Sequence, residues 1–87
     1  MKVKFSKKFG KNYDKAPFKI RKAFDSRLEQ LLVDKFYPSL NNHALTGKYK
    51  GFRSINITGD WRAVFRELKS GEIVYFDLLG THSKLYK

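Results

Sequence analysis

The chain has 87 residues, enough for a single domain with one small hydrophobic core. Hydrophobic residues make up 41% of it, with eight Phe, so a folded core is expected rather than a disordered chain. Lys and Arg number 19 against 8 Asp and Glu, and the net charge of +11 favours a nucleic acid, ahead of an anionic membrane surface or an acidic protein, as partner.

The composition also excludes several classes of protein. Cys is absent, which excludes disulfides and thiolate zinc sites, and no metal or cofactor is expected. Residues 1–5 lack the apolar core of a signal peptide, and no apolar run approaches the length that spans a membrane. We therefore expect a cytoplasmic protein with no membrane partner.

Two helices are predicted in the first half of the chain. Ser6 is a suitable N-cap for a helix over residues 7–15, which Ala16-Pro17 breaks. Pro17 suits the first turn of a second helix, and Tyr37-Pro38 should end it, because a residue before proline avoids helical backbone angles. The second helix is amphipathic, with apolar positions at helical spacing: Ile20, Phe24, Leu28, Leu31 and Leu32.

Strands are predicted around Val3 and Phe5 and over residues 52–57, 61–68 and 72–79, with turns at 58–60 and 69–71. In the second of these strands, alternation places Phe52, Ser54 and Asn56 on one face and Arg53, Ile55 and Ile57 on the other. The expected fold is a single α+β domain over residues 1–87 in the order β-α-α-β-β-β, with two N-terminal helices packed on an antiparallel sheet.

Three segments form an ordered set of motifs. Residues 45–53 contain Leu-x-Gly and then Gly-x-Arg, residues 59–65 contain Asp-Trp, and residues 80–86 contain Gly-Thr-His. Together they resemble the RelE/ParE superfamily of toxins, and within it the YafQ-like branch of toxin–antitoxin ribonucleases. The resemblance covers the whole chain. It implies helices on a compact sheet, cleavage of messenger RNA on the ribosome with inhibition of translation, and neutralisation by a cognate antitoxin.

Metal-free cleavage of RNA uses the 2′-hydroxyl as the nucleophile against the adjacent phosphate. It requires a base for that hydroxyl, an acid for the leaving 5′-oxygen and positive charge for the phosphorane. Histidine suits the proton transfers because its ordinary pKa lies near neutrality. Arginine suits the charge because it binds phosphate oxygens in pairs.

The resemblance nominates four catalytic residues. His82 in Gly-Thr-His is the expected general acid, and His43 is the expected general base or substrate-orienting group. Asp60 would orient a histidine or accept a proton, and Arg53 would bind phosphate. The structural alternatives are surface histidines, an ordinary turn aspartate and a solvated strand arginine.

A second group is expected to bind RNA. Trp61 and Tyr86 would stack on bases, although both residue types also serve as packing anchors. Arg62 would bind phosphate. Eight lysines occur in the first 22 residues, and three of them, Lys7, Lys8 and Lys11, are expected to follow the ribosomal RNA backbone, unless they form a solvated helical face.

Two positions depart from the YafQ-like pattern. Asn56 stands where the branch commonly has a second histidine, and Leu78 stands where it has an arginine. Asn forms hydrogen bonds but does not shuttle protons near neutral pH. Two alternatives to a ribonuclease remain. One is a non-catalytic, gyrase-directed toxin, as on the ParE side of the superfamily. The other, which Asn56 and Leu78 favour, is a decayed member that only binds an antitoxin or RNA.

Overall fold

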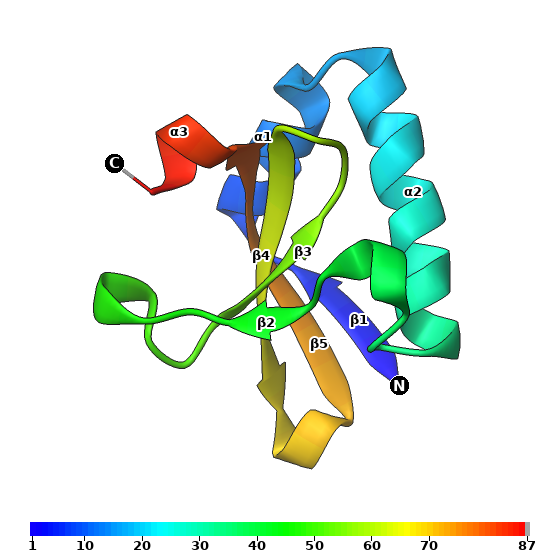
Figure 1. Ribbon diagram of the computed structural model, residues 1–87, viewed down its shortest axis with the longest axis vertical. Coiled ribbons are helices and arrows are strands. Elements are labelled where there is room, and N and C mark those ends of the chain that lie inside the picture. Colours follow the sequence, from blue (N-terminus) through cyan, green and yellow to red (C-terminus); the bar gives the residue numbers. More distant parts are fainter. Residues whose placement is uncertain (87) are drawn as a thin grey trace.

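A five-stranded sheet with a helical pair on one side organises the chain in a computed structural model that describes residues 1–86 (Figure 1). The strand order is β1-β5-β4-β3-β2. The strands are β1 (Lys2–Phe5), β2 (His43–Ala44), β3 (Arg53–Asn56), β4 (Trp61–Leu68) and β5 (Ile73–Thr81). The helices are α1 (Lys7–Lys15), α2 (Phe18–Val33) and α3 (His82–Leu85), with single 3-10 turns at Pro38–Leu40, Gly47–Tyr49 and Lys69–Gly71.

The α+β class and the helical pair are confirmed. Helix α1 has the predicted bounds because Ser6 Oγ accepts a hydrogen bond from the Phe9 backbone N–H at 2.9 Å. Helix α2 ends at Val33, before the predicted stop at Tyr37-Pro38. The chain becomes extended at Asp34, whose carboxylate accepts from the Phe36 N–H at 3.0 Å and closes a turn there.

The sheet is mixed rather than wholly antiparallel. The pairs β2–β3, β3–β4 and β4–β5 are antiparallel as expected, but β1 runs parallel to β5. Parallel neighbours require a long crossover, which α1, α2 and the intervening strands provide. Strand β2 and helix α3 were not predicted, because a two-residue strand and a four-residue helix carry too short a pattern to detect.

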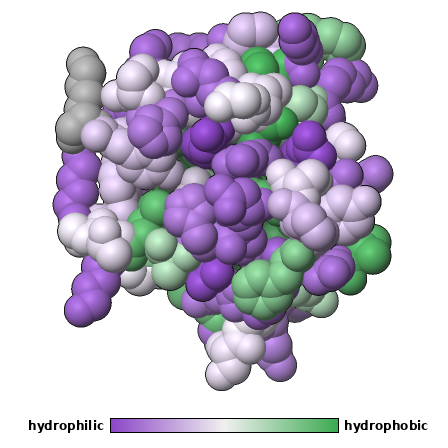
Figure 2. Space-filling model, viewed as in Figure 1, coloured by the Kyte–Doolittle hydropathy of each residue, from purple (hydrophilic) through white to green (hydrophobic). Residues whose placement is uncertain are grey.

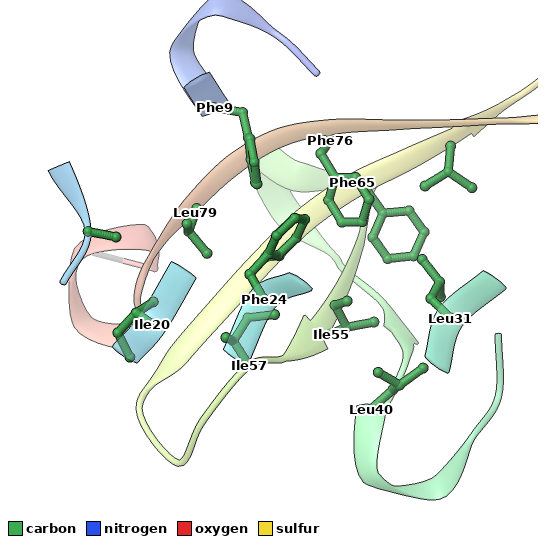
Figure 3. Close-up of a cluster of buried hydrophobic side chains, with 13 residues drawn as sticks. Phe9, Ile20, Phe24, Leu31, Leu40, Ile55, Ile57, Phe65, Phe76 and Leu79 are labelled. Atoms are coloured by element: carbon green, nitrogen blue, oxygen red, sulfur yellow. The ribbon is translucent and has the colours of Figure 1, made fainter. Parts of the chain in front are cut away.

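One face of the sheet packs against α1 and α2 and forms the main core (Figure 3). Three rings meet there, with centroids 5.0 Å apart for Phe9 and Phe24, 5.1 Å for Phe24 and Phe76, and 5.6 Å for Phe9 and Phe76. Full burial of each Phe contributes roughly 2–3 kcal/mol to stability. From the sheet side the core also takes Ile55, Ile57, Ala63, Phe65, Val74 and Leu79.

The two helices are also linked through Tyr13, whose hydroxyl donates to Asp25 Oδ1 at 2.9 Å. Burial raises the pKa of Tyr13 above its ordinary 10.0, and the hydrogen bond to Asp25 raises it further. The phenol therefore stays protonated and remains a donor throughout the physiological pH range.

The opposite face of the sheet has a smaller cluster of its own, formed by Val64, Leu78 and Leu85. Four side chains pack against this second cluster and fasten the loop before β3 and the C-terminal helix α3 to that face: Leu45, Tyr49, Phe52 and Tyr86. A bulge lies beside it, because Val64 pairs with Leu78 and Phe65 pairs with Phe76, which leaves Asp77 without a partner in β4.

None of the helices within residues 1–86 has the length and apolar character needed to cross a bilayer.

Replacement of Ser6 by Ala tests how α1 is joined to the sheet. Besides capping α1, the Ser6 hydroxyl donates to the carbonyl of Asp77 at the bulge, at 3.0 Å. We expect Ser6→Ala to lower the free energy of unfolding by about 1–2 kcal/mol in urea denaturation. Ser26→Ala, at an exposed position of α2, is the control and should stay within about 0.5 kcal/mol of wild type. Equal stability of the two variants would refute the capping role.

Candidate active site

The C-terminal tail is positioned by the end of β5. The His82 N–H donates to the carbonyl of Asp60 at 2.8 Å, and the Thr81 hydroxyl caps α3. Leu85 then folds back over Gly80, where an added Cβ would lie 3.3 Å from a Leu85 methyl carbon. Glycine at this position therefore allows the tail to pack closely, which places His82 at the start of α3 with its side chain exposed.

Tyr86 anchors the same tail from its other end. Its hydroxyl donates to Ser54 Oγ at 2.9 Å, and Ser54 is fully buried. The ring of Tyr86 lies 4.8 Å from the ring of His82, edge to face at 65°. The buried hydroxyl pair thus fixes one aromatic ring, and that ring limits the orientations open to the histidine.

Arg62, the second residue of β4, is held by main-chain oxygens of the preceding turn. Its Nη1 donates to the carbonyls of Thr58 at 3.0 Å, Gly59 at 3.2 Å and Trp61 at 3.0 Å. Its Nε and Nη2 make no hydrogen bond within residues 1–86, and no carboxylate there forms an ion pair with the guanidinium. The guanidinium is thus oriented by neutral groups and keeps its charge for an anion.

His43 lies in β2, at the outer edge of the sheet. Its Nδ1 is 2.8 Å from the carbonyl oxygen of Asn41, a residue with left-handed backbone angles (φ 47°). A carbonyl only accepts, so the neutral ring carries its proton on Nδ1. Nε2 is left as an acceptor, which is the form a general base requires.

These groups meet at one hollow of about 380 Å³. His43 comes from β2, Arg62 from the start of β4, and His82 and Tyr86 from the tail. Asn41 and Leu45 complete the lining. The hollow therefore combines a proton acceptor, a second imidazole, a fixed positive charge and an aromatic ring.

The side chains of Asp60 and Trp61 point elsewhere. The Asp60 carboxylate is exposed in the turn between β3 and β4, and it is the main-chain carbonyl that engages the tail. Trp61 packs, half-buried, against the main core. Because successive residues of a strand face opposite sides, Arg62 points to the hollow and Trp61 does not.

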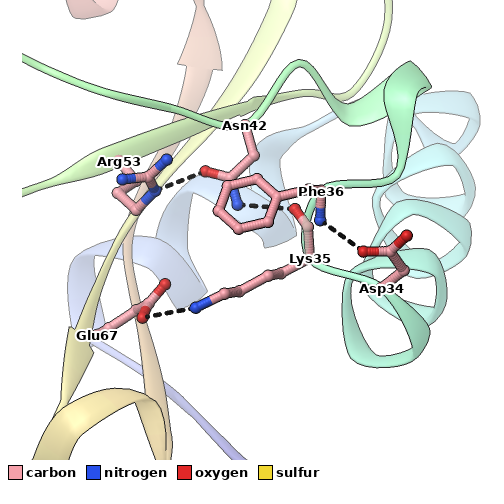
Figure 4. Close-up of polar contacts among 6 residues, drawn as sticks. All are labelled: Asp34, Lys35, Phe36, Asn42, Arg53 and Glu67. Carbon is pink, nitrogen blue, oxygen red and sulfur yellow. Dashed lines mark hydrogen bonds and ion pairs between the residues drawn. The ribbon is translucent and has the colours of Figure 1, made fainter.

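The structure does not bring Arg53 to the histidines. Its Nε donates to Asn42 Oδ1 at 2.8 Å, and its guanidinium lies 5.7 Å from the centre of the Phe36 ring (Figure 4). It lines a separate hollow of about 300 Å³, beside the ion pair that Lys35 forms with Glu67 at 3.4 Å. Arg62, which we had expected only to bind RNA, occupies the position suited to a charge-stabilising group.

The three N-terminal lysines are exposed on α1: Lys7, Lys8 and Lys11. This helix is tied to β5 by Asn12, whose side-chain oxygen accepts from the Leu79 N–H at 3.0 Å. The lysines therefore lie on an element joined to β5 shortly before His82, outside the hollow itself.

The two departures from the YafQ-like pattern have different surroundings. Leu78 is buried in the second cluster with Val64 and Leu85, so it supports the tail that carries His82. Asn56 pairs with Arg62 in the register, and its Oδ1 is buried without a hydrogen-bond partner among residues 1–86. An acceptor without a donor is costly in a folded protein, and Asn56 neighbours Arg62 without itself lining the hollow.

Asn41 lines the hollow but was not among the residues predicted from the sequence. Its carbonyl sets the protonated nitrogen of His43. Asn is among the few residue types enriched in left-handed conformations, so an Asn pair directly after a Pro-Ser-Leu turn was an available signal.

Residues 1–87 match the family model of YafQ, a bacterial toxin of a type II toxin–antitoxin system. YafQ from Escherichia coli BL21(DE3) is similar in structure, with a TM-score of 0.72, 22% identity, and coverage of 98% of this chain and 97% of that one. No curated protein matches the sequence significantly.

Two further solved structures share the fold. For the YoeB/ParE toxin from Agrobacterium tumefaciens the TM-score is 0.80 at 19% identity, over 94% of this chain and 99% of that one. For the RelB–RelE antitoxin–toxin complex from Methanococcus jannaschii it is 0.75 at 21% identity, over 97% and 95%. Because the family model matches the chain from end to end, this protein belongs to the YafQ family of bacterial toxins of type II toxin–antitoxin systems.

Proposed function

We propose that the chain is a ribosome-dependent messenger-RNA endonuclease that cleaves without a metal and inhibits translation. The observation that carries the proposal is the convergence of His43, Arg62 and His82, from three separate elements, on one hollow. Two imidazoles and one guanidinium are the groups that cleavage by a 2′-hydroxyl requires.

The roles follow from the contacts of each group. Nε2 of His43 accepts the proton of the 2′-hydroxyl, and the 2′-oxygen forms a bond to the adjacent phosphorus. Arg62, held at the rim by three carbonyls, stabilises the negative charge of the phosphorane. The bond to the 5′-oxygen breaks as protonated His82 donates a proton to it, which leaves a 2′,3′-cyclic phosphate and a 5′-hydroxyl.

Tyr86 and Asn56 assist without transferring protons. Tyr86 positions His82 through its ring and presents a surface on which a base can stack. Asn56 pairs with Arg62 in the sheet, and its buried, unpartnered Oδ1 is suited to accept a hydrogen bond from the arginine during the reaction. The proton transfers therefore rest on the two histidines.

The proposed partners are the ribosome and an antitoxin. The net charge of +11 and the exposed lysines of α1 support docking on ribosomal RNA. The similar RelE chain was solved with an antitoxin, RelB, which supports a cognate antitoxin here as well. An acidic antitoxin segment would match the charge of this surface. Such a system operates in the cytoplasm, where ribosomes and messenger RNA are found.

Removal of the imidazole of His82 tests the general acid. We expect His82→Ala to lower the rate of cleavage of ribosome-bound messenger RNA by about 10²- to 10⁴-fold in a purified translation system. Ser83→Ala, the exposed neighbour on the same helix, should keep the wild-type rate. Unchanged cleavage by His82→Ala would refute the assignment. If expression of the protein is toxic and damages DNA while messenger RNA stays intact, the protein is a gyrase-directed toxin. If it binds an antitoxin but is not toxic, it is a decayed member of the family.

Substitution of Arg62 tests the charge-stabilising role. We expect Arg62→Ala to lower the cleavage rate constant by about 10²- to 10³-fold. Arg62→Lys should restore only part of the lost rate, because lysine keeps the positive charge but cannot bind two phosphate oxygens at once as the guanidinium does. Arg21→Ala is the matched control: Arg21 also binds a main-chain carbonyl, that of Ala16 at 3.0 Å, but it lies on α2. Equal losses in the Arg21 and Arg62 variants would contradict a specific role.

Gly80→Ala tests whether the packing of the tail positions His82. The added methyl group would crowd Leu85, so we expect displaced backbone amide resonances over residues 81–86, slower cleavage, and a stability loss of about 1–3 kcal/mol. Gly10→Ala is the control, because an added Cβ there meets nothing within 4 Å and alanine favours the helix. Normal cleavage by Gly80→Ala would show that the close packing is not needed.

A further inference from the structure

A row of alternating cations and aromatic rings crosses the sheet at the end away from the hollow. Tyr75 in β5 pairs with Lys4 of β1 on one side and with Arg66 of β4 on the other. Phe52 directly precedes β3 and lies next to Arg66. The order across the four strands is therefore Lys4, Tyr75, Arg66 and Phe52, which we call the cation–aromatic row.

Arg66 is held between the two rings of this row. Its guanidinium carbon lies 5.6 Å from the centre of the Phe52 ring and 5.2 Å from that of Tyr75. The side chain is exposed, the two rings are half-buried, and no carboxylate within residues 1–86 forms an ion pair with it. The rings thus orient a flat, charged group without neutralising it.

The row shares its face of the sheet with the hollow. Residues two and four apart in a strand point to the same side, so Arg62, Val64 and Arg66 follow one another along β4 on one face. Four residues of strand span about 13 Å. Helices α1 and α2 pack on the other face and leave this one to the tail and to the loop of residues 45–52.

That loop bridges the space between the hollow and the row. Leu45 and Tyr49 pack against the second cluster, while Lys48 is exposed, with its ammonium 5.3 Å from the centre of the Tyr49 ring. Positive charge over an aromatic ring therefore recurs between the two ends of the face. Hydrophilic side chains also cover most of the surface in view in Figure 2, with apolar ones confined to separate patches.

We propose that the cation–aromatic row binds single-stranded RNA that flanks the nucleotide in the hollow; this rests on the proposed function, in which RNA is the substrate. The exposed guanidinium plane of Arg66, oriented by the two half-buried rings, suits stacking with any base, and Lys4 and Arg66 suit the phosphates between bases. Stacking tolerates any base, so the row is expected to add affinity along the strand with little sequence preference.

The test measures binding separately from cleavage. The probe is a fluorescein-labelled oligouridylate, titrated by anisotropy into protein that carries His82→Ala to prevent cleavage. Against this background we expect Arg66→Ala and Tyr75→Leu each to weaken binding about 5- to 150-fold, which corresponds to 1–3 kcal/mol per stacked base. Arg66→Ala should also reduce the dependence of affinity on salt by about one phosphate contact.

Two controls separate stacking from charge. Arg66→Lys keeps the charge and should recover the salt dependence but not the full affinity. Lys22→Ala removes a cation that also lies over a ring, 5.4 Å from the centre of Phe18, but on α2, and it should bind RNA as the His82→Ala parent does. Thermal melts show that each variant is folded.

The outcomes distinguish this proposal from the proposed function. If the wild type cleaves ribosome-bound messenger RNA but Arg66→Ala and Tyr75→Leu do not weaken RNA binding, the role of the row is refuted and the nuclease function is supported. If the two variants weaken RNA binding but the wild type does not cleave, the nuclease function is refuted and the role of the row is supported. If both variants bind RNA normally but lose affinity for a labelled oligoglutamate peptide, the row is instead a docking surface for an acidic protein.

Discussion

A sheet with apolar side chains on both faces has to be shielded from water on both sides, and in this protein different kinds of element shield the two faces. Helices α1 and α2 cover one face with a large aromatic core. The other face is covered by a loop and a four-residue helix that meet on Val64, Leu78 and Leu85. An isolated helix of that length is unstable in water, so α3 depends on this contact for its order. The candidate active site depends on the same contact, because His82 begins α3 and Tyr86 directly follows it.

The electrostatics of the hollow depend on neutral groups rather than on counter-charges. Three carbonyls orient Arg62, one carbonyl sets the protonated nitrogen of His43, and a ring flanks His82. Within residues 1–86 the single ion pair, Lys35 with Glu67, lies at a different hollow. Positive groups that are oriented but not neutralised attract a polyanion strongly, and that suits a protein whose proposed substrate carries one charge per nucleotide.

The sequence was sufficient where the determining interactions are local. The bounds of α1 follow from Ser6 and from Ala16-Pro17, and those of β4 follow from its alternation between two turns. The parallel pairing of β1 was not accessible, because it depends on where the helical crossover returns the chain. The same holds for the docking of α3, which depends on contacts between residues far apart in the sequence.

The different positions of Arg53 and Arg62 relative to the hollow were partly predictable from the sequence. Alternation already placed Arg53 on the face of Ile55 and Ile57, and those two isoleucines are in the main core. Trp61 likewise shares the face of Ala63 and Phe65. The alternation of side chains along the strands therefore predicts the observed faces of Arg53 and Trp61 better than the motif resemblance does. The tautomer of His43 could not be predicted, since it depends on a backbone carbonyl that only the folded turn brings within 2.8 Å.

The separation of the two faces has a consequence for how such a protein can evolve. The side chains of the main core and the residues that line the hollow lie on opposite sides of one layer, and none of the core residues lines the hollow. Substitutions at sites without shared partners have nearly additive effects. Residues that only line the hollow, such as Asn41 and His43, can therefore be exchanged without changing the main core that holds the helices to the sheet. The stability of the fold and the chemistry of the hollow can therefore change largely independently, even in a chain this short.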